Sequence, residues 1–271
     1  MSGTITLPPI PAFNRISANE AGYVASFAKT DPQTKSDAAY LTAQAPKLTS
    51  PDKLLQDYRS LSIVLGAFGI GSYINDTALL KQLMTQNPSD TKSTAYQMAN
   101  PALTRFATAM GQFATSPFSS ATNVTALLNA AATNNYEAAQ DTLSPGLSDA
   151  LYFSRNIGSV TNIDQLMADP KLLQVAQVAT NMPSQFGTLD FNTQVRLLSQ
   201  QINIKNFSQP GAVQRFITKY LAMNEANNTT ATDTTGALAI LTGSGSSGNM
   251  LSALMSQGGG TGADPILSLF A

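Results

Sequence analysis

Residues 48–70 read LTSPDKLLQDYRSLSIVLGAFGI, and this stretch occurs a second time in the chain. Residues 160–182 read VTNIDQLMADPKLLQVAQVATNM and align with the first copy without a gap, 112 positions later. The matching pairs are Thr49/Thr161, Asp52/Asp164, Leu54/Leu166, Asp57/Asp169, Arg59/Lys171 and Leu61/Leu173. Upstream, SDAAY at residues 36–40 returns as SDALY at residues 148–152. Because an internal repeat decides the architecture, we predict a fold of two related halves.

Each copy has the pattern of a short helix followed by a longer one. In the first copy, Thr49 or Ser50 can cap the short helix and Asp57 can cap the longer one. The longer helix spaces its apolar residues three, four and seven positions apart, which predicts one buried stripe. These residues are Leu61, Val64, Leu65 and Phe68.

The polar residues that recur in both copies have a structural explanation. We interpret the recurring aspartates as helix caps, because neither copy offers the neighbouring acid or base that catalysis needs. They are the pairs Asp52/Asp164 and Asp57/Asp169. The recurring tyrosines, Tyr40 and Tyr152, lie on apolar faces, and we expect both in the core.

Each half closes with a helix that begins at a proline. An arginine stands just before a phenylalanine at the matching place in both helices, Arg105 in the first and Arg215 in the second. A salt bridge or a solvated face is the simplest interpretation of these arginines. Contact with an anion or a protein partner is the alternative, and it makes Arg105 and Arg215 candidate interaction residues.

No segment alternates long enough to build a sheet, so we predict an all-α fold. It consists of two tandem pseudo-repeats of about 110 residues, each a bundle of short helices, followed by a flexible tail rich in Gly and Ser. The predicted parts are an extended N-terminal arm at 1–15, repeat 1 at 16–113, repeat 2 at 114–224 and the tail at 225–271. Prolines at positions 8, 9 and 11 favour the extended arm.

The tail ends in a short apolar segment that follows a Gly-rich tether. Its apolar residues are Ile266, Leu267, Leu269 and Phe270. Because such a tether lets an anchor search a volume at high effective concentration, we predict that this segment docks on a partner, on another subunit or on the chain's own helices. We also expect function where the two copies differ, at residues 87–99 and 183–190.

Composition excludes several classes of function. The chain contains no Cys, His or Trp, so it lacks the usual ligands for zinc, copper and haem, and also the Ser-His-Asp and Cys-His nucleophile systems. We therefore predict no catalytic, cofactor-binding or metal-binding residue, and no cofactor. Its net charge is −1 and charged residues make up 11%, which does not favour nucleic-acid binding. The apolar runs are too short for a membrane span, and the N-terminus lacks a signal-peptide pattern. We expect the chain in the cytoplasm or exported without a cleaved signal.

The sequence resembles a known family along most of its length. The residues that carry the resemblance are SDAAYL, then KLTSPDKLLQDYRSLSIVLGAFGI, then LLKQLMTQNPSDTKSTAYQMANPALTRFATAMGQF. This order is similar to a family of alphaproteobacterial domains of unknown function that are commonly encoded in flagellar gene neighbourhoods. The resemblance covers roughly residues 15–224; the second copy lacks the glycine after the long helix and shortens the later element. It implies a flagellar context and brings no catalytic residues.

These observations lead to one main hypothesis and two alternatives. The main hypothesis is a non-enzymatic structural or interaction protein of the bacterial flagellum, either an exported component or an assembly factor. Its partners are then proteins, either flagellar components or another copy of the chain. The first alternative is a cytoplasmic helical binding module, chaperone-like, with a groove between the repeats. The second is an enzyme, which would need a deep pocket holding two buried carboxylates with raised pKa.

Overall fold

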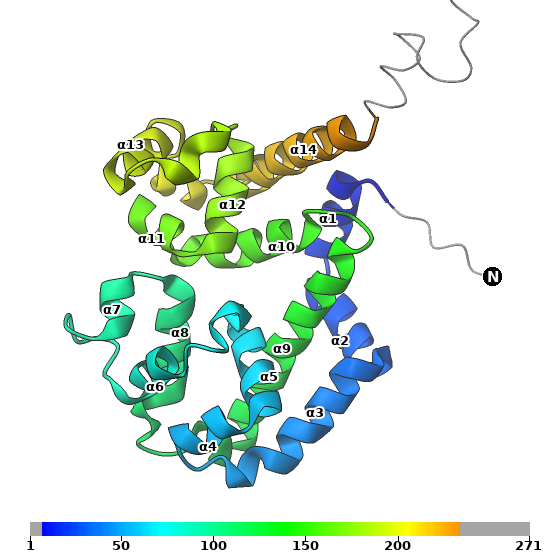
Figure 1. Cartoon of the computed structure of the whole chain (residues 1–271). Helices are drawn as coiled ribbons and strands as arrows, with labels where there is room; N and C mark the ends of the chain where they lie inside the picture. The colour runs from blue at the N-terminus through cyan, green and yellow to red at the C-terminus, as the bar shows by residue number, and fades with distance from the viewer. Residues whose placement is uncertain (1–6, 234–271) are drawn as a thin grey trace, which may run out of the picture. The chain divides into compact units, whose positions relative to one another are not determined.

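The computed structural model describes residues 7–233, and residues 1–6 and 234–271 lie outside this account. Within the described range the chain forms fourteen α-helices and seven 3-10 helices and no strand (Figure 1), which confirms the all-α prediction. The chain divides into two compact units, residues 1–224 and 225–271. Of the second unit, only residues 225–233 are described, as the end of the last helix.

A first hydrophobic core lies in the first half of the chain. Its helices are α3 (Pro32–Gln44), α4 (Pro51–Gln56), α5 (Tyr58–Phe68), α6 (Thr77–Thr85), α7 (Thr94–Met98) and α8 (Pro101–Met110). The 3-10 helices here are η1 (Ala45–Lys47), η2 (Gly71–Tyr73), η3 (Gly111–Phe113) and η4 (Pro117–Ser119). Leu65, Leu80 and Phe106 are fully buried at its centre. The apolar stripe predicted for α5 faces this core and includes the buried Leu65. Phe68, at the end of the stripe, is only half-buried.

A second core is built from the helices that follow. They are α10 (Leu147–Asn156), α11 (Ile163–Ala168), α12 (Pro170–Ala179), α13 (Phe191–Gln201) and α14 (Ala212–Asp233). The 3-10 helices are η5 (Ile157–Ser159), η6 (Ser184–Thr188) and η7 (Ile204–Ser208). Phe153, Phe207 and Phe216 pack against one another in this core, with ring centroids 5.1–5.6 Å apart. Such aromatic contacts add to the stability that burial alone gives.

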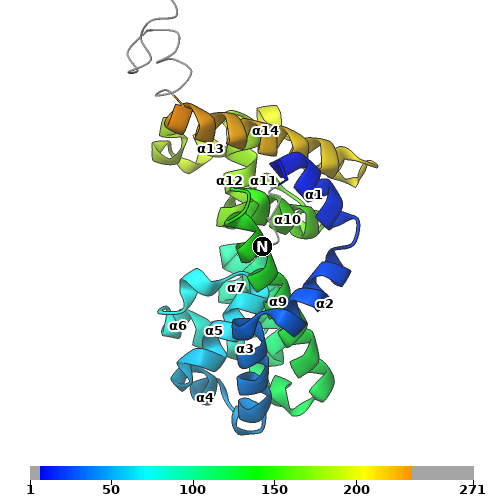
Figure 2. The ribbon, with the colours of Figure 1, turned by 90° about the vertical axis from the view of Figure 1, so that its right-hand side faces the viewer.

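The N-terminal residues belong to the second core, not to an extended arm. Residues 9–17 form helix α1 (Pro9–Ser17), and Phe13 and Ile16 bury one face of it against α10 (Figure 2). The prediction of an extended arm over residues 1–15 is therefore wrong for this part. The prolines at positions 9 and 11 fall in the first helical turn, where a helix does not need their missing N–H groups. Helix α2 (Glu20–Thr30) then leads to α3 and packs along α9.

The long helix α9 (Ala121–Asp141) belongs to both cores. Its first part contributes Leu127 and Ala131 to the first core, and its last part contributes Ala132 and Tyr136 to the second. Figure 1 shows it running from the helices of one core to those of the other. From the sequence alone, a helix is predicted only near residues 124–132, because Leu127 and Leu128 are its only strong apolar residues. The cores meet inside α9, between Ala131 and Ala132, and not at the expected boundary between 113 and 114.

Four helix caps recur at the expected spacing of 112 residues. They are Ser50 for α4, Asp57 for α5, Asn162 for α11 and Asp169 for α12. The interpretation of Asp57 and Asp169 as caps is confirmed. The interpretation of Asp52 and Asp164 as caps is wrong. They lie in the first turns of α4 and α11, which are capped by other residues. A carboxylate in the first turn still stabilises the helix, because it lies near the positive end of the helix dipole.

Candidate functional site: the seam between the two cores

Asn100 links the two cores directly. Its Nδ2 donates a hydrogen bond of 2.6 Å to the carbonyl oxygen of Ala168, at the end of α11. Its Oδ1 accepts from the backbone N–H groups of Ala102 and Leu103, and so caps α8. Asn100 is only 2% exposed. One buried side chain therefore fixes the start of α8 against the end of α11, and we call the boundary that passes here the seam.

A second buried contact lies beside it. Asp169 accepts a hydrogen bond of 2.8 Å from the hydroxyl of Tyr152 and also caps α12. Burial, together with the charge of Asp169, raises the pKa of Tyr152, so this hydroxyl keeps its proton. Gly69, at the end of α5, approaches the same ring: a Cβ there would lie 2.7 Å from Tyr152 Cε2. Its φ of 72° also favours glycine, so α5 can end against the ring only because residue 69 has no side chain.

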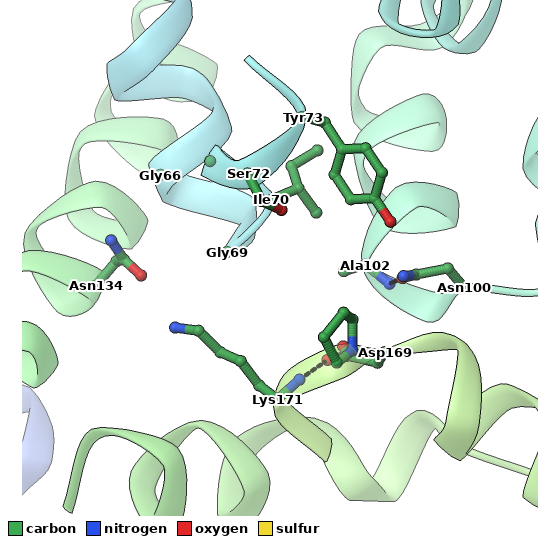
Figure 3. Close-up of a pocket in the computed structure, with 12 residues that line it drawn as sticks. Gly66, Gly69, Ile70, Ser72, Tyr73, Asn100, Ala102, Asn134, Asp169 and Lys171 are labelled. Atoms are coloured by element: carbon green, nitrogen blue, oxygen red, sulfur yellow. Dashed lines mark hydrogen bonds between the residues drawn. The ribbon is translucent and has the colours of Figure 1, made fainter. Parts of the chain in front are cut away.

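A cavity of about 380 Å³ opens between these contacts, and we call it the seam cavity (Figure 3). Its lining residues are Gly66, Gly69, Ile70, Gly71, Ser72, Tyr73, Asn100, Ala102, Asn134, Asp169, Pro170 and Lys171. Figure 3 shows Lys171 extending from α12 on the side of Asn134, with Tyr73 on the opposite side near Asn100. The first core and the second both contribute walls to this cavity.

A second hollow lies on the other side of the start of α8, with a volume of about 440 Å³. Its lining residues are Pro88, Ala95, Tyr96, Ala99, Pro101, Thr104, Arg105, Ser159, Asn162, Asp164 and Gln165. We call it the Tyr96 hollow, because the side chain of Tyr96 is 56% exposed there. Much of its wall comes from residues 87–99, one of the two stretches where the sequence copies differ.

The structure separates the two candidate arginines. Arg105 lies in the Tyr96 hollow, half-buried, and its Nη1 donates a long hydrogen bond of 3.5 Å to Ser159 Oγ. Within residues 7–233 it forms no ion pair. Arg215 is exposed on α14, lines neither hollow, and its Nη1 lies 3.5 Å from the carbonyl oxygen of Pro210. The candidate residues of the tail, Ile266, Leu267, Leu269 and Phe270, lie outside the described residues.

Sequence reasoning missed a buried ion-pair cluster. Glu137 on α9 is completely buried and forms a two-pronged ion pair with Arg155 on α10, with Nη2 to Oε2 at 3.0 Å. Arg155 also contacts Glu20 on α2, with Nη1 to Oε1 at 3.1 Å. Burial raises the pKa of Glu137, and the hydrogen bonds and charge of Arg155 oppose that rise. No fixed spacing joins these three positions in the sequence, so no local pattern could have identified them.

Two further features of residues 7–233 concern metal ions and membranes. No group of three or more Asp or Glu side chains among residues 7–233 is placed to hold a metal ion. In the same part of the chain, no helix combines the length and apolarity needed to cross a membrane.

Comparison with known proteins places the fold and the family. No curated protein matches this sequence. The crystal structure of protein AGR_C_984 from Agrobacterium tumefaciens has a similar fold, with a TM-score of 0.68 and 19% sequence identity, over 84% of this chain and 99% of that one. A family model matches residues 67–213, a range that includes Tyr96, Arg105 and Lys171. The chain therefore belongs to the family described as "Protein of unknown function (DUF1217)".

Proposed function

We propose that the chain is a non-enzymatic interaction protein and that the Tyr96 hollow binds a segment of a protein partner. The observation that carries this proposal is the pairing of an exposed aromatic ring with an arginine that has no carboxylate partner among the described residues. Tyrosine and arginine are the residue types that most often supply binding energy in protein interfaces. Both lie in a hollow, where a partner side chain can be enclosed on several sides.

The hollow has the chemical layout of a small interface. Pro88, Ala95 and Pro101 provide apolar surface, while Asn162, Asp164 and Gln165 provide polar groups; Asp164 forms no ion pair with Arg105. An apolar centre with a polar rim is typical of binding surfaces between proteins. A partner segment with an apolar side chain next to a carboxylate or a backbone carbonyl would match both Tyr96 and Arg105.

We further propose that the partner is a flagellar protein, with the chain acting as an exported component or an assembly factor. The support is the resemblance to domains encoded in flagellar gene neighbourhoods, together with a Cys-free chain of low charge that suits export. The test is to delete the gene, score swimming and flagella, and look for the protein in the sheared flagellar fraction. Normal motility together with absence from that fraction would contradict the flagellar proposal.

A cytoplasmic, chaperone-like binding module is the second candidate. The observation that favours it is the position of both hollows at the seam, where a groove-binding module would hold its client. Co-purification with one exported protein, and absence from the filament, distinguishes this role from that of an exported component.

We propose no catalytic role for the buried carboxylates. Asp169 is occupied by the Tyr152 hydroxyl and two backbone N–H groups, and Glu137 is paired with Arg155. Glu137 lines neither the seam cavity nor the Tyr96 hollow. The two groups thus do not face each other in one pocket.

A further inference from the structure

The first observation is a difference between matching positions in the two halves. Arg59 in the first half is neutralised locally: its Nη2 lies 2.9 Å from Asp37 Oδ1 and 2.6 Å from Ser36 Oγ. Lys171 stands at the matching position in the second half, and Asp149 matches Asp37. Yet Lys171 forms no side-chain hydrogen bond or ion pair within the described range. The cation that is paired in one half is therefore unpaired in the other.

The lysine faces the seam cavity. Its Nζ lies 4.9 Å from the centre of the Tyr152 ring, and the side chain extends into the cavity (Figure 3). Its charge is felt by Asp149, whose pKa is raised by burial and lowered in part by Lys171, but the two do not form an ion pair. The ammonium group thus faces the cavity without an ion pair to any residue in the range 7–233, so it can still bind an anion.

Other polar groups of the same cavity are also uncommitted. The side chains of Asn134, Tyr73 and Ser72 line it from α9 and η2, and none of them makes a hydrogen bond with residues 7–233. Together with Lys171 from α12, side chains from α9 and η2 thus bring unused donors to the lining of one cavity. Ser72 and the neighbouring Gly71 are exposed, so the cavity is open to solvent.

The charge of the wall selects the kind of ligand. Asp169 lines the cavity with a carboxylate that already accepts three hydrogen bonds, so it adds negative charge without offering a free binding position. One lysine next to one carboxylate suits a singly charged anion and disfavours a phosphate dianion. A volume of about 380 Å³ lies at the small end of the range for ligand pockets and accepts a small acid or one acidic side chain.

We propose that the seam cavity binds a single carboxylate group, held by Lys171 and hydrogen-bonded by Asn134. The carboxylate comes either from a free small acid or from a Glu or Asp side chain of a peptide. This site is separate from the Tyr96 hollow, so the carboxylate proposal can be tested independently of the proposed function.

The experiment titrates the full chain with four probes and follows the amide signals of Gly69, Gly71 and Asn134 by NMR. The probes are butyrate, N-acetyl-glutamate N-methylamide, the matching glutamine compound and inorganic phosphate. We expect saturable shifts with both carboxylates and none with the glutamine compound. Tighter binding of butyrate identifies a free acid as the ligand class, and tighter binding of the glutamate compound identifies an acidic side chain. Equal binding of the glutamine compound, or tighter binding of phosphate, overturns the proposal.

Variants assign the binding to Lys171. Lys171→Met keeps the length of the side chain and removes its charge, and it should weaken carboxylate binding by about tenfold or more. Lys219→Met, at an exposed lysine on α14, is the matched control and should bind as the parent chain does. Asn134→Leu fills the cavity from α9 and should also abolish binding, which keeps the test valid if Lys171→Met does not fold. Unchanged binding in both cavity variants overturns the proposal.

Discussion

The hydroxyl of Tyr152 donates a hydrogen bond of 2.8 Å to Asp169, the residue that caps α12 seventeen positions later. The same contact occurs in the first half, where Tyr40 donates to Asp57 at 3.0 Å, again seventeen positions later. A cation lies over each tyrosine ring, Arg59 over Tyr40 and Lys171 over Tyr152. The repeated sequence thus encodes a three-part contact: a tyrosine, a capping aspartate and a cation two residues after the aspartate.

Removing the hydroxyl of Tyr152 should destabilise the fold. In Tyr152→Phe, one oxygen of the buried Asp169 loses its partner, so we expect the free energy of unfolding to fall by about 1–3 kcal/mol, measured with urea. Tyr40→Phe is the matched control: Asp57 is less buried, and water can replace the lost hydroxyl. An equal or larger loss in Tyr40→Phe would show that burial at the seam does not set the strength of this contact.

Gly69→Ala should destabilise the fold more than Gly111→Ala does. The new Cβ would meet the Tyr152 ring and the residue would keep its positive φ. We therefore expect the free energy of unfolding to fall by about 2 kcal/mol or more, measured with urea. Gly111→Ala is the control, because Gly111 also has a positive φ but its Cβ would meet no atom within 4 Å. In Gly111→Ala the free energy of unfolding should fall only by the cost of holding an alanine at positive φ, about 1 kcal/mol. Equal losses would mean that the ring contact contributes nothing.

Two substitutions separate the two roles of Asn100. Serine can still cap α8 but is too short to reach the carbonyl oxygen of Ala168. The free energy of unfolding of Asn100→Ser should therefore fall by about 1 kcal/mol, because this hydrogen bond is lost. Asn100→Ala loses the cap as well and should be about 1 kcal/mol less stable than Asn100→Ser. Amide hydrogen exchange checks the assignment: Ala102 and Leu103 should exchange faster in Asn100→Ala and stay protected in Asn100→Ser. Faster exchange in both variants would contradict it.

Stability should fall at alkaline pH. Burial raises the pKa of Tyr152 and Tyr220 above their usual value of 10.0, and raises that of Tyr136 to about 12. In the unfolded chain these tyrosines ionise near pH 10, while in the folded chain they keep their protons. The folded state therefore binds more protons, and its stability decreases as pH rises through 10. Urea unfolding at pH 8 and above pH 10 measures the loss, and tyrosinate absorbance should show the late titration. A stability that rises over this range would contradict the account.

The features that could be predicted from the sequence are local ones. Asp57 and Asp169 are recognisable as caps because a cap bonds to residues two or three positions away. The same holds for the apolar stripe of α5, which depends only on helical periodicity. Helix α1 was missed although its signals are local, since prolines in a first turn resemble prolines in an extended segment.

The features that could not be predicted depend on distant residues. Nothing in the sequence pairs Glu137 with Arg155, or Asn100 with Ala168, because these contacts form only when separate helices pack together. Gly69 directly follows the long helix in the sequence, but its contact with Tyr152 requires both halves to be in place. Arg105 and Arg215 look equivalent in the sequence, and only the fold places one in a hollow and leaves the other on an open helix surface.

Site-specific photo-crosslinking tests the central proposal most directly. A photoreactive phenylalanine replaces Tyr96 in the hollow or, as the control, Tyr58, which is 65% exposed and lines neither hollow. Expressed in a strain that lacks the native gene, the chain should form an adduct with one defined protein from position 96 and not from position 58. Adding Arg105→Ala should reduce that adduct, and adding Arg215→Ala should leave it unchanged. No adduct at position 96, or the same adduct at both positions, would contradict the proposal that this hollow binds a partner.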